Sequence, residues 1–319
     1  MTYKVPFTHG LMFHHFHDED LHLPSQGSID KDQFYNLIKF VGRENILNAE
    51  EYYHRFENNK LKPSDTCLTF DDSLLCQYDV ALPIMEELKI RGFWFIYSAP
   101  FFGKLDRLKI YRYFRHHYFA HLDEFYSEFF KHVTTTKNLE TFFNSKNKEI
   151  KNRKKINPFY TLTDIKFRLV RDDFLNKDQF ENIMRIMMTD KQFDEKKAVR
   201  NLYFTNKHLK YLANDSHLLG LHSYNHPTKM ENLDYESQKS EYLRNLNHLK
   251  KIAGKDIKAM SHPCCSYDGS TIQILEELDI GIAFRANMFL ENGMKIINPS
   301  KYEIAREDHT NIIKMMSES

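Results

Sequence analysis

Short apolar runs alternate with segments of helical periodicity along most of this sequence. Each run is β-prone, and the segment after it repeats its apolar positions every three or four residues. Expected strands lie at residues 10–16, 66–70, 93–98, 217–222, 257–261, 280–285 and 302–305, and the clearest helices at 28–41, with Ser28 as N-cap, 233–252 and 270–278. Because strands that alternate with helices form parallel sheets, the sequence predicts an α/β fold, a closed or nearly closed β/α barrel of about seven strands.

The alternation is interrupted between the strand that ends near Ser98 and the strand at 217–222. Far more residues separate these strands than a β-α connection needs. The intervening residues are rich in Phe, Tyr, Lys and His, and amphipathic stretches such as 180–188 predict helices. We therefore expect a discontinuous barrel, residues 1–102 and 202–319, with a helical insertion subdomain at 103–201. Its aromatic faces suit a packing cap or the interface of a homo-oligomer as well as a wall that selects a substrate.

Composition is that of a soluble globular protein. The 319 residues include 45 Lys and Arg against 44 Asp and Glu, and 41% are hydrophobic. A nucleic-acid-binding protein would need a net basic face, so this class is disfavoured. The sequence holds no apolar run of roughly 20 residues, the length that a membrane span requires.

The N-terminus and the cysteines favour a cytoplasmic location. The first residues lack the basic, apolar and small-residue regions of a signal peptide. Of the four cysteines, Cys264 and Cys265 are adjacent, and none forms the Cys-x-x-Cys pattern of a zinc knuckle. We expect reduced thiols in the cytoplasm.

Two short motifs predict a metal site. Asp71 and Asp72 close the strand at 66–70, and His222 and His226 follow the strand at 217–222. One carboxylate and two imidazoles hold a divalent cation with open coordination positions, and the second carboxylate stays free to act as a base toward water. Either motif alone is weak evidence for a metal site. In a chain with 17 histidines, about one His-x-x-x-His pair is expected by chance. Together, each on a strand end, they indicate a hydrolase.

These motifs resemble those of the polysaccharide deacetylases of the NodB-homology type, a metal-dependent carbohydrate esterase family. That family has Thr-Phe-Asp-Asp-Gly, followed by His-Ser/Thr-x-x-His-Pro. The resemblance implies a distorted β/α barrel, with Asp71 as catalytic base and Asp72, His222 and His226 as metal ligands. Ser73 stands where the family usually has glycine.

A third segment resembles the family less closely. Residues 261–268 correspond to its Arg-x-Pro-Tyr-Gly-x-Tyr-Asn motif, with Ser261 in place of the arginine and Cys264 in place of the tyrosine. The resemblance implies substrate contacts at Pro263 and Cys264, and an oxyanion held by the backbone N–H of Cys264. Because the family's arginine orients and tunes the base, its absence leaves the charge environment of Asp71 open, and Arg285 and Arg306 are the two candidates to replace it.

Three further histidines are candidates for the site. His14 and His15 end the first expected strand, in a segment that resembles the Tyr-His segment of many family members, and are expected to line the pocket. Histidines satisfied by backbone partners are the alternative. His309 follows the last expected strand and is the candidate proton donor to the departing amine, although its surroundings differ from the family's Leu-x-His.

The function expected from these residues is metal-dependent removal of an N-acetyl group from a sugar. Zn²⁺ is the expected cation, with Co²⁺, Ni²⁺ and Fe²⁺ as alternatives. The expected substrate is a cytoplasmic amino-sugar or nucleotide-sugar intermediate of surface-glycan biosynthesis. The alternative is a catalytically silent barrel that binds metal or glycan as a scaffold, which the departures at Ser73, Ser261 and Cys264 favour. A non-haem iron oxygenase is disfavoured because it has no use for Asp71.

Overall fold

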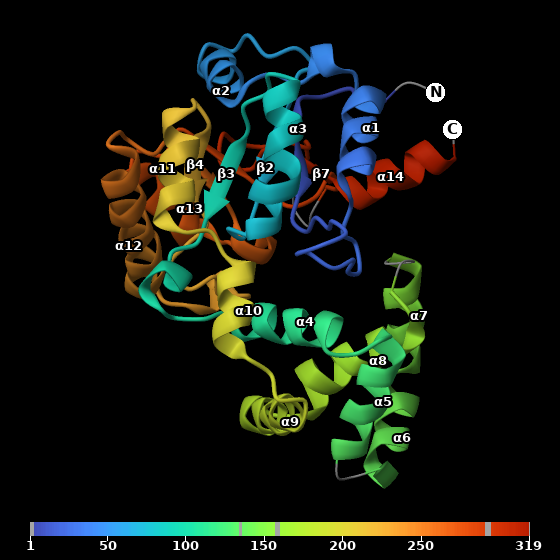
Figure 1. The fold of residues 1–319 in the computed structure, drawn as a ribbon. Coiled ribbons are helices and arrows are strands. Elements are labelled where there is room, and N and C mark those ends of the chain that lie inside the picture. Colours follow the sequence, from blue (N-terminus) through green and yellow to red (C-terminus); the bar gives the residue numbers. More distant parts are fainter. Residues whose placement is uncertain (1–2, 134–135, 157–159, 291–294, 319) are drawn as a thin grey trace. The chain divides into compact units, whose positions relative to one another are not determined.

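The computed structural model describes residues 3–133, 136–156, 160–290 and 295–318 (Figure 1). The chain forms two compact units. We call Met1–His22, Ser28–Asp106 and Asn201–Ser319 the barrel unit, and Leu23–Gly27 with Arg107–Arg200 the insertion unit. The sequence placed the insertion at 103–201 and did not assign the short segment Leu23–Gly27 to it.

The barrel unit contains a seven-stranded sheet whose strand order is β6-β5-β4-β3-β2-β1-β7. All of its pairings are parallel, so the α/β prediction is confirmed. The strands are β1 (His9–Phe13), β2 (Thr66–Phe70), β3 (Phe93–Ile96), β4 (Leu218–Leu221), β5 (Ala259–Ser261), β6 (Ile282–Phe284) and β7 (Arg306–Asp308).

The last strand differs from its prediction and nearly closes the barrel. It was expected at 302–305, but β7 is Arg306–Asp308 and pairs with β1. The residues before it pair with β6 instead, since Ile304 N donates to Ala283 O at 3.0 Å and Arg285 N donates to Ile304 O at 2.9 Å. One extended segment therefore links the two edges of the sheet. The strand Arg306–Asp308 lacks the apolar residues by which buried strands are predicted. Its Arg306 is nevertheless buried, because it forms an ion pair.

Helices follow the strands of the barrel unit. They are α1 (Lys31–Val41), α2 (Ala49–Glu57), α3 (Leu82–Glu87), α11 (Asn206–Asn214), α12 (Tyr235–Ala253), α13 (Gly269–Glu277) and α14 (His309–Ser317). The predicted N-cap of α1, Ser28, is wrong. Asp30 caps the helix because its side chain accepts from Gln33 N at 2.7 Å while the Gln33 side chain accepts from Asp30 N at 3.0 Å, a capping box.

Alternate strand residues pack into separate apolar layers. Phe93 and Phe95 of β3 cluster with Phe284 of β6, whereas Trp94 stacks on Phe70 of β2 with ring centroids 4.3 Å apart. Gly220 is required in β4, because a Cβ there would come within 2.5 Å of the Phe95 ring and 2.9 Å of Ala259 O. These contacts fix the strands whose ends carry the metal motifs.

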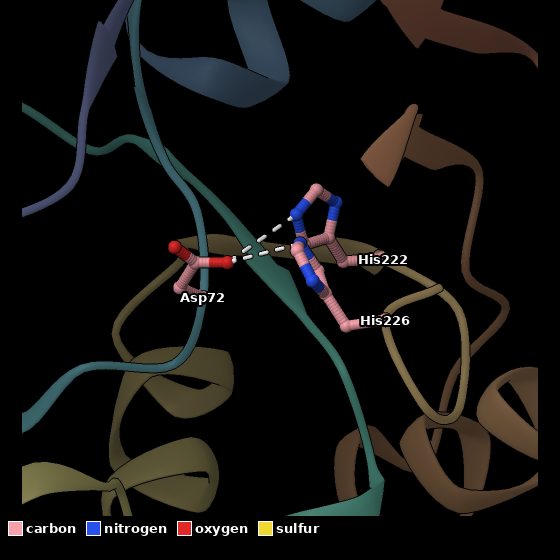
Figure 2. Close-up of side chains that lie close together, drawn as sticks. All are labelled: Asp72, His222 and His226. Atoms are coloured by element: carbon pink, nitrogen blue, oxygen red, sulfur yellow. Dashed lines mark ion pairs between the residues drawn. The ribbon is translucent and has the colours of Figure 1, made fainter. Parts of the chain in front are cut away.

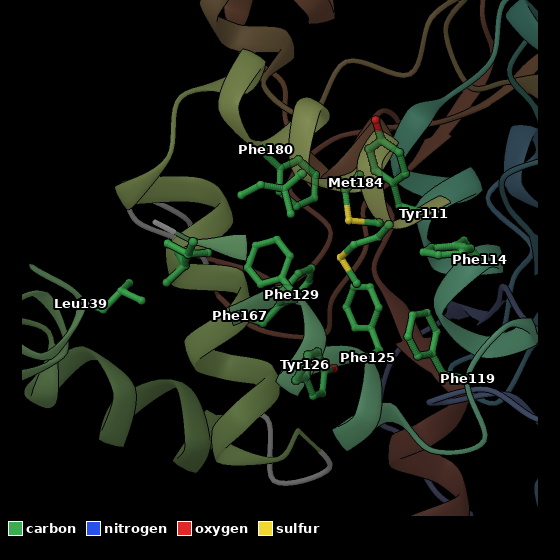
Figure 3. Packing of buried hydrophobic residues seen from close by; sticks show 14 residues of the cluster. Tyr111, Phe114, Phe119, Phe125, Tyr126, Phe129, Leu139, Phe167, Phe180 and Met184 are labelled. Carbon is green, nitrogen blue, oxygen red and sulfur yellow. The ribbon is translucent and has the colours of Figure 1, made fainter. Parts of the chain in front are cut away.

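The described residues of the insertion unit form helices around an aromatic core. The helices are α4 (Arg107–His117), α5 (Leu122–His132), α6 (Thr136–Ser145), α7 (Asn147–Ile156), α8 (Leu162–Leu169), α9 (Lys177–Asp190) and α10 (Glu195–Leu202), whose last residues belong to the barrel unit. Figure 3 shows Phe129 of α5 beside Phe167 of α8, and their centroids are 4.9 Å apart at 79°. Phe180 and Met184 of α9 complete this cluster. The unit thus has a hydrophobic core of its own.

Among the described residues, no helix combines the length and apolarity that crossing a membrane requires.

Candidate active site

The predicted metal ligands lie together in the barrel unit. Asp72 follows β2, and His222 and His226 follow β4, on either side of β3. Figure 2 shows the three side chains pointing toward one another, with Asp72 Oδ1 at 3.6 Å from His222 Nε2 and 3.2 Å from His226 Nε2. The ligand atoms of all three lie within 4.8 Å of one another. One carboxylate and two imidazoles fit a divalent cation with positions left open for water and substrate.

A backbone carbonyl fixes the orientation of His222. Its Nδ1 lies 2.8 Å from Ser261 O, which can only accept a hydrogen bond, so Nδ1 carries the proton. In the neutral imidazole, Nε2, the atom that faces Asp72, then keeps its lone pair. Metal-binding histidines are usually held in this way, so His222 is prepared for a cation.

Two side chains of α12 organise the metal loops, and sequence analysis missed both. Asn245 accepts from His222 N at 2.9 Å and donates to Ile96 O at 2.9 Å, which ties the ends of β3 and β4. Glu241 accepts from the backbone N–H groups of Tyr224 at 3.1 Å and Asn225 at 2.7 Å. No local signal in the sequence marks them, because polar residues four apart on a helix are typical of its solvent face, and their burial is seen only in the structure.

Asp71 forms a buried, bidentate ion pair with Arg306. Its two carboxylate oxygens each lie 2.8 Å from a guanidinium nitrogen. Burial by itself would raise the pKa of Asp71, but Arg306, with smaller contributions from His222 and His14, lowers this pKa to about 2. Asp71 is therefore ionised throughout the neutral pH range.

Arg306, rather than Arg285, is the arginine at the carboxylate. Arg306 comes from β7 and contacts Ser261, the residue in the family's arginine position. The Ser261 hydroxyl accepts from Arg306 at 2.7 Å and lies 3.2 Å from Asp71 Oδ2. Arg285 donates instead to Asn287 Oδ1 at 2.6 Å and to Ile297 O at 2.8 Å. The departure at Ser261 is thus accompanied by a guanidinium from another strand.

The departure at Ser73 falls on a position with left-handed backbone. Its φ is +58°, a region that glycine adopts without the steric penalty of a side chain. Its carbonyl accepts from Phe204 N at 2.9 Å, which holds the turn in place. A glycine preference at this position therefore has a conformational reason.

His14 borders both carboxylates. Its Nε2 lies 3.9 Å from Asp71 Oδ2 and 3.9 Å from Asp72 Oδ2, and its side chain is 30% exposed. The backbone carbonyl of His15 accepts from Ile29 N at 3.3 Å, and its place in the pocket stays a prediction.

The remaining predicted residues lie on loops and strand ends of the barrel unit. Pro263 is buried, and Cys264 is exposed with a φ of +53°. His309 begins α14 and is buried; its Nδ1 lies 3.2 Å from Met12 O, and its ring stacks on Phe13 with centroids 5.5 Å apart. The roles proposed for these three residues stay predictions.

Comparison with known proteins supports the resemblance inferred from the motifs. Residues 172–283 match the family model described as polysaccharide deacetylase. That range contains the second and third motifs, whereas Asp71 and Asp72 lie outside it. No curated protein sequence matches the chain at a significant level.

Several solved structures share the fold at low sequence identity. A deacetylase of Streptococcus pyogenes, PplD, solved in complex with acetate, is 16% identical with a TM-score of 0.55 over 99% of both chains. IcaB from Ammonifex degensii is 11% identical, with a TM-score of 0.54 over 96% of this chain and 93% of its own. A de-N-acetylase from Aggregatibacter actinomycetemcomitans is also 11% identical, with a TM-score of 0.54 over 97% and 98%. These likenesses confirm the nearly closed barrel.

Proposed function

We propose that this chain is a metal-dependent hydrolase that removes the N-acetyl group of a sugar, a proposal supported by the match of residues 172–283 to the polysaccharide deacetylase family model. One observation carries the proposal. The Asp72, His222 and His226 cluster lies beside a second carboxylate, Asp71, whose ionised form is held by Arg306. A ligand set with a separate ionised carboxylate beside it has the division of labour of a metal-assisted hydrolase.

The cation supplies Lewis acidity. Asp72, His222 and His226 would hold the cation, which we expect to be Zn²⁺, with Co²⁺, Ni²⁺ and Fe²⁺ as alternatives. Bound there, it would polarise the acyl carbonyl and lower the pKa of the attacking water. Asp71 accepts the proton of that water, and the paired nitrogens of Arg306 hold its two oxygens in a fixed plane.

The low pKa of Asp71 has a benefit and a cost. At about 2, it keeps the carboxylate ionised wherever the protein is folded, so the base is always available. A carboxylate with so low a pKa is also a weak base, and general-base catalysis is most effective when the pKa lies near the working pH. The mechanism therefore depends on a water that is already acidified.

Two histidines are candidates for the proton donor to the amine. His309 is the prediction from the sequence, but it is buried with its Nδ1 against Met12 O. His14 is partly exposed and lies 3.9 Å from an oxygen of each carboxylate. Since a donor must reach both the site and the substrate, we propose His14 as the donor and His309 as its alternative.

The substrate proposed is an N-acetylated amino sugar. That this sugar is a nucleotide-linked or other intermediate of surface-glycan biosynthesis stays a prediction. The cytoplasmic location of the protein also stays a prediction. Backbone N–H of Cys264 is the proposed donor to the oxyanion.

A catalytically silent scaffold is the second candidate. The departures from the family motifs at Ser73, Ser261 and Cys264 favour it. The departure at Ser261 favours it less, because Arg306 supplies the guanidinium that the family's arginine would provide. A scaffold that binds metal or glycan would keep its binding when Asp71 can no longer accept a proton.

The test is acetate release from a panel of N-acetylglucosamine, its oligomers and UDP-N-acetylglucosamine. Asp71→Asn should lower the rate by about 10² to 10⁴-fold, the range lost with a general base. Asp65→Asn is the matched control, because Asp65 is also buried, precedes β2 and pairs with an arginine, Arg55, at 3.2 Å.

Asp65→Asn should retain activity, with circular dichroism and thermal unfolding reporting the fold of both variants. Acetate release that persists in folded Asp71→Asn would remove Asp71 as the base. Metal binding without acetate release from any sugar of the panel by the wild type would favour the scaffold.

A further inference from the structure

Tyr97 and Tyr203 lie beside the metal ligands in the barrel unit. Tyr97 directly follows β3, the strand between the ends of β2 and β4 that carry the ligands. Tyr203 lies opposite Leu74 in an isolated antiparallel bridge, and the next residue, Phe204, donates its N–H to Ser73 O at 2.9 Å. Backbone contacts thus hold Tyr203 against the turn that follows Asp72.

The two phenol rings lie close to each other, and that of Tyr97 lies close to a metal ligand. The Tyr97 ring lies 5.3 Å from the His226 ring and 6.0 Å from the Tyr203 ring, measured between centroids. Burial raises the pKa of both phenols well above its usual value, and the carboxylates of Asp106 and Asp72 add to this effect in both. Tyr97 therefore lies against the ring of one metal ligand, and Tyr203 lies against the turn that follows another.

Both hydroxyl groups are buried, and apart from each other neither has a hydrogen-bond partner among the described residues. An unsatisfied buried hydroxyl costs about 1 to 3 kcal/mol, so folded proteins seldom retain one without a reason. Two such groups close to each other and to the metal ligands can supply only one hydrogen bond between them, so at least one O–H donor gains its acceptor when the site is loaded.

We propose that Tyr97 and Tyr203 are positioning residues of the metal site, whose hydroxyl groups hold the Asp72 carboxylate by hydrogen bonds and so strengthen the binding of the cation. The inference rests on the metal site of the proposed function and extends it to residues outside the family motifs. Carboxylates that bind metals are usually hydrogen-bonded in turn, which fixes the oxygen that faces the ion.

The test is metal affinity of the full chain. Protein stripped with a chelator is titrated with Zn²⁺, and separately with Co²⁺ to follow its visible absorption. Tyr97→Phe and Tyr203→Phe should each weaken Zn²⁺ binding by about 10 to 100-fold, the usual effect of removing such a partner, and should shift the Co²⁺ spectrum.

Tyr242→Phe is the matched control. Tyr242 of α12 is fully buried and its hydroxyl oxygen also has no hydrogen-bond partner among the described residues. Its nearby carboxylates are Glu241 and Asp268 rather than Asp72. Its replacement should leave both titrations at their wild-type values.

Unfolding temperatures separate a positioning role from a packing role. Replacing an unsatisfied tyrosine by phenylalanine removes a buried polar atom, so the metal-free variants should unfold at or above the wild-type temperature. At a fixed, limiting Zn²⁺ concentration they should gain less stability than the wild type, because weaker binding shifts the folding equilibrium less. A lower unfolding temperature in the metal-free variants, with unchanged affinity, would overturn the inference.

The outcomes also separate this inference from the proposed function. If the wild type binds one ion and both tyrosine variants bind it equally well, the positioning role is wrong and the proposed hydrolase stands. If the wild type takes up neither Zn²⁺ nor Co²⁺, the metal site fails and the inference fails with it.

Discussion

At the ends of its strands the barrel unit buries Asp71, Asp72 and Arg306, whereas the core of the insertion unit is built from aromatic rings, methionines and aliphatic side chains. The insertion unit also buries a carboxylate, Asp164, but that group is satisfied within the unit. It accepts from Tyr126 at 2.6 Å and from Arg168 at 3.1 Å. Asp72 instead faces two imidazoles. Burial of a charge therefore does not mark a site; the partners that surround the charge do.

The largest effect is expected from Arg306→Gln in the barrel unit. It leaves Asp71 buried without its guanidinium, and breaking a buried ion pair costs about 3 to 5 kcal/mol. The pKa of Asp71 should rise, because burial raises it and Arg306 opposes that effect. The acid limb of the pH-rate profile should move to higher pH, with the rate and the unfolding free energy both lowered. Arg306→Lys should restore part of each.

A large effect confined to packing is expected from Phe129→Ala in the insertion unit. Removing this buried ring leaves a cavity in the aromatic core and should cost about 3 to 5 kcal/mol of unfolding free energy. If the barrel unit holds the site by itself, the Zn²⁺ affinity should stay at the wild-type value. A loss of Zn²⁺ affinity in this variant would show that the metal site also depends on the insertion unit.

An intermediate effect is expected on acidification, through His217 of the barrel unit. Its Nδ1 accepts from Trp94 Nε1 at 2.9 Å and from Gly92 N at 3.1 Å, which requires an unprotonated Nδ1. Burial, and then Arg91, lower its pKa from 6.5 to about 3. As the pH falls, His217 is therefore protonated in the unfolded chain before it is protonated in the folded protein.

The stability that neutral His217 contributes should be complete above pH 6.5 and should be lost progressively as the pH falls from 6.5 toward about 3. His217→Gln offers an acceptor that does not titrate, and denaturant unfolding across this range should show a shallower decline. An identical pH dependence in the variant would contradict the assignment.

The smallest effect is expected from Ser73→Gly. The φ of +58° disfavours a side chain, so glycine should stabilise the barrel unit by about 1 kcal/mol. Thermal unfolding measures this gain, and Ser223→Gly, at a φ of +63°, provides a second left-handed serine for comparison. A loss of stability at Ser73→Gly would show that the serine side chain has a structural role.

The sequence predicted the parts of the fold and site that depend on local pattern. The strand Thr66–Phe70 has its predicted bounds because five β-prone residues end at two carboxylates. The metal cluster was predicted because each of its motifs ends a strand and parallel strands end at one edge. The strand and each of the two metal motifs are visible within a few residues of chain.

Features that depend on distant partners could not be predicted. The pairing of Arg306 with Asp71 joins residues 235 positions apart, and nothing local distinguishes Arg306 from Arg285. The strand β7 was missed for the same reason, since its arginine is polar yet buried. Glu241 and Asn245 look like the solvent face of a helix until the loops they hold are in place.

The most direct test of the account is the metal content of the purified chain, measured by elemental analysis together with acetate release. The wild type should hold one divalent ion, lose acetate release on chelation and recover it with added Zn²⁺. His226→Ala, which removes one ligand, should hold substantially less metal. A wild type that holds no ion after reconstitution, or a His226→Ala variant with full metal and activity, would contradict the central claim.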